Sequence, residues 1–384
     1  MIKWIKVICM TYFDYSATTP VNSEVLDSFV KATNMYVGNP NSLHKLGVDS
    51  KHLIDSATKQ IEELLNIKDK EVIYTSGSSE SNNLAIMGIA MKYSNRGKHI
   101  ITTHLEHSSI NEPLNYLSTL GYEISYVKLD NNGLVDLNEL EKLIRDDTIL
   151  VTITAVNSEV GVRQPVEMIG KIIARYSKCY FHVDATQCIG KDHIDLSNVD
   201  LVSLTAHKIY GLKGIGILLR NKKIELEPII RGGKSTSIYR SGTPSLPLIV
   251  SISKALRLAL QDMDKNIQYV KSINFDLRNY FKEYDKVRIN SNDYSVPYIL
   301  NISVLGVKPE SLLHALEKHD IYVSTKSACS SNNDESEAVY NITGNHEQAA
   351  SSIRISLSHL TTIDDIDNLK KAFKACYEEL ACLK

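Results

Sequence analysis

Hydrophobic and polar residues follow two different periods along this chain. Between about residues 50 and 220, short continuously apolar runs alternate with segments in which apolar residues recur every three or four positions. The short runs predict buried strands, and the wider spacing predicts amphipathic helices. The predicted strands are residues 71–75, 99–103, 148–156, 180–184 and 201–205, and the predicted helices are residues 51–65, 82–92 and 166–176. Alternation of helices with fully apolar strands indicates an α/β fold, with a mostly parallel sheet covered by helices.

The rhythm changes near residue 260. Beyond this point the pattern predicts two long helices, a strand and a final helix, at residues 251–263, 267–284, 299–304 and 366–380. This change predicts a smaller α+β domain in the C-terminal part of the chain. The predicted organisation is an N-terminal segment that joins the small domain, a large domain and the small domain, at residues 1–15, 16–262 and 263–384.

Composition narrows the class of protein. The 384 residues are 43% hydrophobic and 23% charged, and 43 Lys and Arg against 45 Asp and Glu give a net charge of −2. This balance argues against a polybasic nucleic-acid binder and against a basic membrane-surface protein. No apolar run approaches the roughly 18 residues of a membrane span. Six scattered cysteines without a CxxC pair disfavour a structural zinc site and favour a reducing cytoplasm, so we expect no metal.

A turn rich in serine follows the first predicted strand. Ser78 and Ser79 come directly after Gly77, where a helix is expected to begin. Free backbone N–H groups and the helix dipole make such a turn a candidate phosphate site. The same residues also fit a plain helix cap.

Two later strands end in residues that carry charge. Asp184 closes the strand at residues 180–184, where a buried carboxylate needs hydrogen bonds or a cationic partner such as a protonated ring nitrogen. Lys208 follows the strand at residues 201–205 and stands beside His207, which fits a Schiff-base nucleophile. An N-cap aspartate and a solvated surface lysine are the simpler alternatives. The G-x-G spacing near Gly211 lacks the dinucleotide-binding pattern.

One cysteine has an unusual context. Cys329 stands in a small, polar stretch with Lys326 nearby, so we expect an accessible thiol whose thiolate the lysine favours. An incidental surface cysteine is the alternative. Taken together, a phosphate cradle, an aspartate and a lysine are the parts that a pyridoxal phosphate enzyme requires.

The same motifs, in the same order, carry a family resemblance. The chain resembles the NifS-like cysteine desulfurases of the class V aminotransferase family, which are fold-type I enzymes dependent on pyridoxal 5'-phosphate (PLP). The resemblance covers residues from about Tyr12 to near the C-terminus. Its motifs are Asp14-Tyr-Ser-Ala-Thr-Thr-Pro20, Gly38-Asn-Pro40, Thr75-Ser-Gly77 with Glu80, Glu106-His107, Val156-Asn-Ser-Glu-Val-Gly161, His182-Val-Asp-Ala-Thr-Gln187, His207-Lys-Ile-Tyr-Gly211, Arg240-Ser-Gly-Thr243, Ser327-Ala-Cys329 and Ser351-Ser-Ile-Arg354.

The resemblance implies a role for each matching residue. Lys208 forms the Schiff base with the cofactor, His107 stacks on the pyridine ring and assists proton transfer, and Asp184 pairs with the ring nitrogen. Further cofactor contacts are implied for Gln187 with the phenolic oxygen, for Asn157, and with the phosphate for Ser78, Ser79, Thr205 and His207. Thr243 reaches the phosphate of a second subunit, which implies a homodimer. Asn157 and Arg354 position the substrate, and Cys329 accepts the sulfur.

The implied activity is a PLP-dependent conversion of L-cysteine to L-alanine with a persulfide on Cys329. The expected sulfur acceptor is an iron–sulfur scaffold protein or a tRNA-thiolation enzyme, in the cytoplasm. A selenocysteine lyase, another class V lyase or aminotransferase, and a non-catalytic binding protein are the alternatives. The sequence departs from the family's commonest text at Thr325 and Lys326, where Ser-Gly is usual, and at His359, where many relatives carry arginine.

Overall fold

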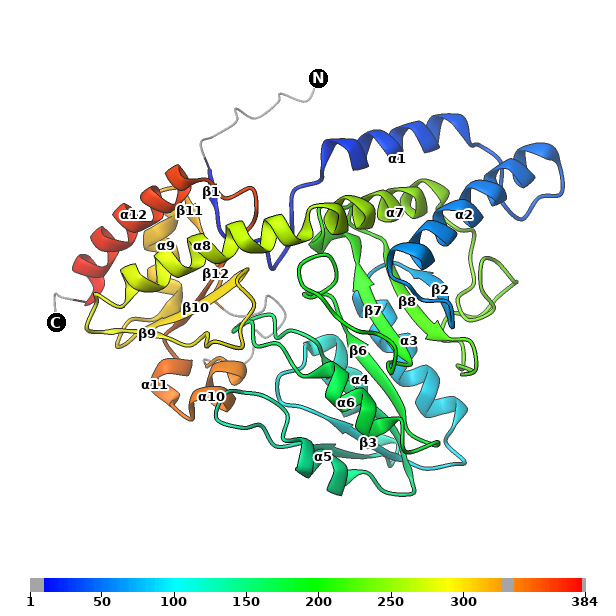
Figure 1. Ribbon diagram of the computed structural model, residues 1–384, viewed down its shortest axis with the longest axis horizontal. Coiled ribbons are helices and arrows are strands. Elements are labelled where there is room, and N and C mark those ends of the chain that lie inside the picture. The colour runs from blue at the N-terminus through cyan, green and yellow to red at the C-terminus, as the bar shows by residue number, and fades with distance from the viewer. Residues whose placement is uncertain (1–9, 326–334, 382–384) are drawn as a thin grey trace.

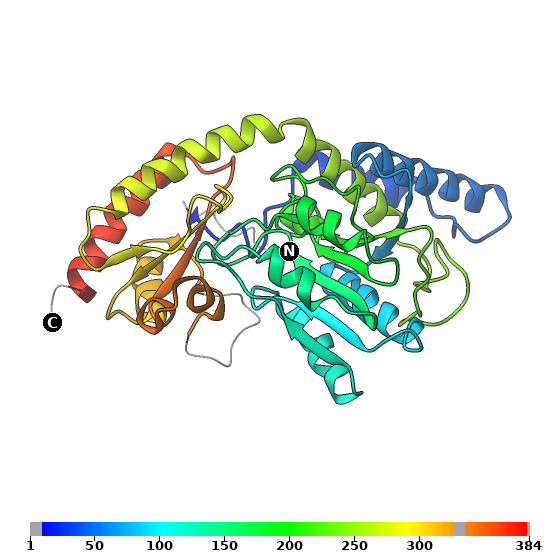
Figure 2. The ribbon, with the colours of Figure 1, turned by 60° about the horizontal axis from the view of Figure 1, so that its bottom comes forward.

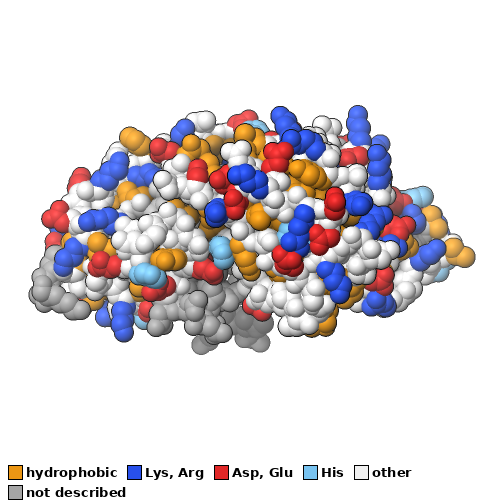
Figure 3. All heavy atoms as spheres, turned by 90° about the horizontal axis from the view of Figure 1, so that it is seen from below, with side chains coloured by type: hydrophobic (Ala, Val, Ile, Leu, Met, Phe, Trp, Pro, Cys, Tyr) orange, Lys and Arg blue, Asp and Glu red, His pale blue; other side chains and the backbone are white. Residues whose placement is uncertain are grey.

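The computed structural model describes residues 10–325 and 335–381 (Figure 1). Cys329 and Lys326 lie outside the described residues. Figure 3 shows acidic and basic side chains interspersed over one face of the molecule, as the near-zero net charge predicts. In the described part of the chain, no helix is both long enough and apolar enough to cross a membrane.

A seven-stranded sheet forms the centre of the larger part of the molecule. Its strand order is β2 (Lys70–Thr75), β8 (Gly216–Asn221), β7 (Leu201–Thr205), β6 (Tyr180–Asp184), β5 (Thr148–Thr154), β3 (His99–Thr102) and β4 (Glu123–Tyr126). The pairs from β7 to β4 are parallel, and β8 pairs antiparallel with both β2 and β7. The predicted α/β fold with a mostly parallel sheet is therefore confirmed.

Helices cover both faces of this sheet (Figures 1 and 2). The helices of this part are α1 (Ser23–Met35), α2 (Lys45–Leu64), α3 (Ser78–Lys92), α4 (Ser108–Thr119), α5 (Leu137–Leu143), α6 (Val166–Ile173) and α7 (Leu246–Gln261). On β2, Ile73 belongs to the cluster formed with α3 and α4, whereas its neighbour Val72 belongs to the cluster formed with α2, α6 and α7. Adjacent strand residues point to opposite faces, so both faces need apolar side chains.

The C-terminal part is a smaller α+β unit. Its elements are α8 (Met263–Phe281), β9 (Val287–Ile289), β10 (Ile299–Val304), α9 (Pro309–Glu317), β11 (Ile321–Tyr322), α10 (Glu337–Thr343), α11 (His346–Ala349), β12 (Ser352–Ser356) and α12 (Ile363–Ala381). Strands β9, β10 and β12 form an antiparallel sheet, and α7 and α8 run across the top of both units (Figure 2). The first strand, β1 (Thr11–Tyr12), pairs with β11. The domain boundaries at residues 15 and 262 stay predictions.

Several elements differ from those predicted, and polar residues explain most of the difference. Helix α3 begins at Ser78, as the turn at Gly77 predicted, whereas the apolar spacing starts only at residue 82 because the buried Ser81 and Asn82 are polar by type. Helix α4 was not predicted, since two serines and Pro113 obscure its apolar spacing. Strand β8 was not predicted either. Its first residue, Gly216, follows the glycine-containing loop, so this loop leads into a strand and not into the helix that a dinucleotide motif requires.

Candidate active site

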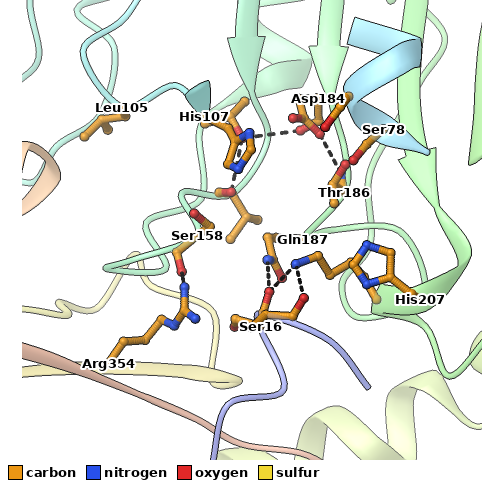
Figure 4. Close-up of a pocket in the computed structure, with 15 residues that line it drawn as sticks. Ser16, Ser78, Leu105, His107, Ser158, Asp184, Thr186, Gln187, His207 and Arg354 are labelled. Carbon is orange, nitrogen blue, oxygen red and sulfur yellow. Dashed lines mark hydrogen bonds between the residues drawn. The ribbon is translucent and has the colours of Figure 1, made fainter. Parts of the chain in front are cut away.

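A cavity of about 250 Å³ opens where the parallel strands end (Figure 4). Its walls are Ser16, Ala17, Ser78, Ser79, Leu105, His107, Thr154, Val156, Ser158, Asp184, Thr186, Gln187, His207, Lys208 and Arg354. Thr154 ends β5, Asp184 ends β6, and Lys208 follows β7. Ligands of α/β proteins bind at this carboxyl edge of the sheet, so the cavity is the candidate active site.

Lys208 belongs to a short 3₁₀ turn, Ala206–Lys208, that directly follows β7. Its Nζ donates to the backbone oxygens of Ser16 at 2.5 Å and of Ala17 at 2.7 Å. These acceptors lie more than 190 positions away in the sequence. The loop after β1 therefore holds the amine at the cavity wall.

Asp184 is 5% exposed, and both of its carboxylate oxygens accept hydrogen bonds. Oδ2 accepts from Asn82 Nδ2 at 2.9 Å, and Oδ1 accepts from the backbone N–H of Thr186 at 3.0 Å. Asn82 lies on α3, so this contact joins the helix to the end of β6. The carboxylate is held in one orientation beside the cavity, which meets the requirement that a buried charge be hydrogen-bonded.

His107 is the N-cap of α4, and its Nδ1 accepts the backbone N–H of Ser109 at 3.1 Å. Burial lowers the pKa of the ring, although the nearby Asp184 carboxylate opposes the shift. An imidazole that is neutral and accepts at Nδ1 carries its proton on Nε2. His107 therefore presents a neutral ring with an Nε2–H group at the cavity.

The N-terminus of α3 forms another wall. Ser78 and Ser79 line the cavity there, and the backbone N–H of Ser76 donates to Glu80 Oε2 at 2.7 Å. Glu80 Oε1 accepts from Arg240 Nε at 2.9 Å, which joins this turn to the loop that carries Thr243. Both contacts brace the turn that precedes the helix.

The remaining predicted phosphate ligands differ in their surroundings. His207 lines the cavity, and its pKa is lowered to about 4 by burial and by the positive charge of Lys208. Thr205 is buried and donates to the backbone oxygen of Ile215 at 3.1 Å, and it is not among the described residues that line the cavity. Thr243 is exposed, and it also lies away from these walls.

Arg354 enters the cavity from β12 of the small unit. The residue is 2% exposed; Nη2 donates to Asp14 Oδ1 at 2.7 Å and Nη1 donates to the Ser158 backbone oxygen at 2.9 Å. Its Nε is buried without a hydrogen-bond partner among the described residues. The guanidinium is thus fixed by two distant segments, and its Nε–H remains available as a donor.

Gln187 lines the cavity, whereas the side chain of Asn157 is used in hydrogen bonds to the backbone. Gln187 Nε2 donates to the Ser16 backbone oxygen at 2.9 Å, and its side chain lines the cavity. Asn157 Nδ2 donates to the Leu105 backbone oxygen at 3.0 Å, and its Oδ1 accepts two backbone N–H groups of the following turn. Asn157 thus supports the loop that bears Ser158, and its role as a ligand stays a prediction.

Sequence reasoning assigned no role to several residues found here. Asp14 was quoted in a motif without a function, and only the fold reveals it as the partner of Arg354. Thr186 Oγ1 is buried without a partner in the described residues, at the cavity wall. Burial raises the pKa of Glu106 to about 8, and its Oε1 accepts from Thr103 Oγ1 at 2.7 Å. The sequence signal for Glu106 was its place beside His107.

The donors and acceptors of the cavity fit pyridoxal phosphate. A helix N-terminus with two serines suits a phosphate, Asp184 suits a protonated ring nitrogen, and Lys208 suits an aldehyde. The spare donors on Thr186 and Arg354 leave further hydrogen bonds to be made by whatever fills the cavity. The chemistry of this donor set therefore agrees with the cofactor that the sequence predicted.

Comparisons with known proteins point to the same family. The aminotransferase class-V family model matches residues 11–369. The cysteine desulfurase IscS of Vibrio vulnificus strain CMCP6 is 43% identical over 378 residues, which are 96% of this chain and 93% of the relative. The mitochondrial cysteine desulfurase of Saccharomyces cerevisiae is 39% identical over 94% of this chain and 73% of its own length.

Solved structures agree with these relatives. A NifS-like protein, 32% identical, superposes with a TM-score of 0.91 over 97% of this chain and all of that chain. A second structure, described as SspA in complex with cysteine, is 30% identical and has a TM-score of 0.80 over 91% of this chain and 99% of that one. The protein therefore belongs to the class-V aminotransferase family and, within it, to the NifS-like cysteine desulfurases.

Proposed function

We propose that the protein is a PLP-dependent cysteine desulfurase that converts L-cysteine to L-alanine and transfers the sulfur to Cys329. The observation that carries this proposal is the cavity in which Lys208, Asp184 and Arg354 meet. These residues come from three regions of the chain, and each has the chemistry for a different part of the reaction. The relatives named cysteine desulfurase, and the similar structure solved with cysteine, support the choice of substrate.

The residues at the sheet edge would hold the cofactor. Ser78, Ser79 and His207, which line the cavity, would bind its phosphate, Asp184 would pair with its ring nitrogen, and Lys208 would bind its aldehyde carbon. When bound, PLP supplies an electron sink that weakens the bonds around the substrate's Cα. The N–H groups of Asn82 Nδ2 and of the Thr186 backbone, which donate to Asp184, would keep its carboxylate directed at the ring.

Arg354 would bind the carboxylate of L-cysteine. Guanidinium groups bind carboxylates through parallel N–H donors, and the buried Nε of Arg354 has a donor available. Asp14 and Ser158 keep the group from turning. The substrate is thereby placed with its Cα between Arg354 and the Lys208 amine.

Lys208 and His107 would move the protons. The Lys208 amine would remove the proton from the substrate's Cα and return one to the product. His107 presents a proton on Nε2 and stays neutral near pH 7, because burial lowers its pKa. A neutral ring can stack on the cofactor without adding a second positive charge beside Lys208.

Cys329 would receive the sulfur. Its thiolate attacks the substrate sulfur as the Cβ–S bond breaks, so L-cysteine and one protein thiol give L-alanine and one protein persulfide, with protons restored from Lys208. Residues on both sides of the Cys329 segment contact Arg354 of the cavity wall or Glu159, the neighbour of the wall residue Ser158. The backbone of Ser324 pairs with that of Arg354, and Ser336 Oγ donates to Glu159 Oε2 at 2.6 Å.

A homodimer and a sulfur acceptor complete the proposal. The exposed position of Thr243, away from the walls of its own cavity, is consistent with a contact to the cofactor of a second subunit. Transfer of the persulfide sulfur to an iron–sulfur scaffold protein or a tRNA-thiolation enzyme stays a prediction of the resemblance.

Two measurements test the proposal. Borohydride reduction of the PLP-loaded protein should leave a pyridoxyl group on the peptide that contains Lys208, detected by mass spectrometry. Treatment with L-cysteine should add one sulfur to the peptide that contains Cys329. Cys329→Ser should lose this sulfur and most of the alanine formation, whereas Cys376→Ser, at a buried site on α12, should keep both. The proposal would be contradicted if Cys329→Ser formed alanine at the wild-type rate, or if the wild-type protein acted only on selenocysteine.

A further inference from the structure

Lys191 is a buried lysine behind the active-site cavity, to which the proposed function gives no role. It lies in the turn that follows β6 and is 6% exposed. Its Nζ donates to Gln187 Oε1 at 3.0 Å. Burial, together with the positive charges of Lys208 and Arg354, lowers the pKa of Lys191 to about 7. Burying a lysine costs free energy, so we expect its contacts to show a function that explains the burial.

The contact with Lys191 fixes which end of the Gln187 amide faces the cavity. A lysine side chain offers hydrogen-bond donors and, when protonated, no acceptor. In the structure the amide oxygen faces the Lys191 donor, and Nε2 turns the other way, toward the Ser16 backbone oxygen, which can only accept. A flipped amide would place its NH₂ group against the Lys191 donors and lose the hydrogen bond.

The outward Nε2 joins Gln187 to the Schiff-base lysine. Nε2 donates to the Ser16 backbone oxygen at 2.9 Å, and the same oxygen accepts from Lys208 Nζ at 2.5 Å. Figure 4 shows the dashed line from Gln187 ending at Ser16, at the cavity wall. Lys191 is thus connected to Lys208 through one side chain and one carbonyl.

From this geometry we propose that Lys191 is a positioning residue, which keeps the Gln187 amide nitrogen directed at the cavity as the donor to the phenolic oxygen of bound PLP. The inference rests on the proposed function, because it assumes that PLP occupies this cavity. Lys191 would act through Gln187 and would not touch the cofactor itself. An N–H donor at that oxygen stabilises its negative charge, and it therefore favours the unprotonated Schiff base.

Other titratable groups surround Lys191. Lys208 and Arg354 lie on the side of the active site, and Cys188 belongs to the same turn. A second cavity of about 430 Å³ adjoins Lys191 on its other side, and the titratable groups there are Glu24, Tyr210, Asp262, Tyr298 and His359. The Glu24 carboxylate is engaged by Lys254 at 2.6 Å. This cavity gives a longer side chain at position 191 room to extend.

The test is a pH titration of the Schiff-base absorbance in the PLP-loaded protein. Lys191→Met should raise the pKa of the Schiff base by roughly one pH unit, the size expected when a hydrogen bond to a charged acceptor is lost. Gln187→Met should raise it equally. The double variant should match Gln187→Met alone, because Lys191 acts through Gln187. Lys191→Arg keeps a donor and should retain the wild-type value.

The outcomes separate this inference from the proposed function. An unchanged Schiff-base pKa in Lys191→Met, or shifts that add in the double variant, would overturn the inference while leaving the proposed function intact. A wild-type protein that forms no Schiff base would overturn both. If Lys191→Met does not fold, Lys191→Leu serves instead. It likewise offers no donor to Gln187 Oε1, so the same rise is expected, and an unchanged value would contradict the inference.

Discussion

The two ends of the active-site cavity are built in different ways. At the cofactor end, Asp184 and Lys208 each follow a strand of one sheet, and the parallel order of the strands brings their ends together. At the substrate end, Arg354 comes from a different sheet, and Asp14 and Ser158 fix it from segments 340 and 196 residues away. Sheet topology thus brings together Asp184 and Lys208, the groups proposed to serve the cofactor. The placement of Arg354, proposed to serve the substrate, depends on how two units pack together.

This difference predicts that variants at the two ends fail in different ways. Changes at the cofactor end should alter the absorbance of the loaded protein and kcat. Changes at the substrate end should alter KM for L-cysteine and leave the absorbance unchanged.

The largest effect is expected for Asp184→Asn at the cofactor end. The variant removes the negative charge that supports a protonated ring nitrogen, so kcat should fall by about a hundredfold to a thousandfold. Asn82 can flip to meet the new amide, because its Oδ1 has no partner among the described residues, and the fold should persist. Steady-state kinetics and the absorbance spectrum check this. Unchanged kcat would remove Asp184 from the chemistry.

A smaller and different effect is expected for Arg354→Lys at the substrate end. Lysine is a point charge and cannot bind a carboxylate through two parallel donors, so kcat/KM should fall about ten- to hundredfold, mainly through KM. Asp14→Asn keeps an acceptor for Nη2 and should cost less. A changed absorbance spectrum in either variant would contradict the separation of the two ends.

Within the cofactor end, Glu106 contrasts with the fully hydrogen-bonded Asp184. Burial raises its pKa from 4.5 to about 8, so the folded protein holds a proton that the unfolded chain releases. The stability from this proton is present below pH 4.5 and is lost as pH rises toward 8. Glu106→Gln removes this loss. Relative to wild type, its free energy of unfolding should therefore rise by about 2 kcal/mol between pH 6 and pH 7.5. Denaturant titrations at the two pH values measure the free energy of unfolding of both proteins. If the difference between Glu106→Gln and wild type were the same at pH 6 and pH 7.5, the raised pKa of Glu106 would be refuted.

The smallest effect per pH unit concerns His182, two residues before Asp184 on β6. Burial lowers its pKa from 6.5 to about 4, and its ring nitrogens contact Thr152 Oγ1 and Ser203 Oγ. Below pH 6.5 the unfolded chain binds a proton at this side chain that the folded protein does not bind. The free energy of unfolding therefore decreases as the pH is lowered from 6.5 to 4. His182→Gln should lessen this fall by about 1 kcal/mol per pH unit. His314→Gln, at an exposed site, is the control. Parallel pH profiles for wild type and His182→Gln would contradict the prediction.

Prediction from sequence succeeded where the signal was local. Strands β6, β7 and β10 have the predicted bounds, because continuous apolar runs between polar turns mark buried strands. It failed for α4, where a capping histidine, two serines and a proline hide the apolar spacing. For α3 the apolar spacing alone began at residue 82, whereas the turn at Gly77 predicted the start at Ser78 that the structure shows.

The sequence by itself determined the α/β fold and the residue types at the strand ends, because hydrophobic periodicity and turn chemistry act over a few neighbouring positions. Only the tertiary structure decided which groups became partners. It brought Asp14 to Arg354, Ser16 to Lys208, and Lys191 to a site beside Lys208 and Arg354. A buried polar group is costly unless it forms a hydrogen bond, and the packing of distant segments determines which partner is within hydrogen-bonding distance.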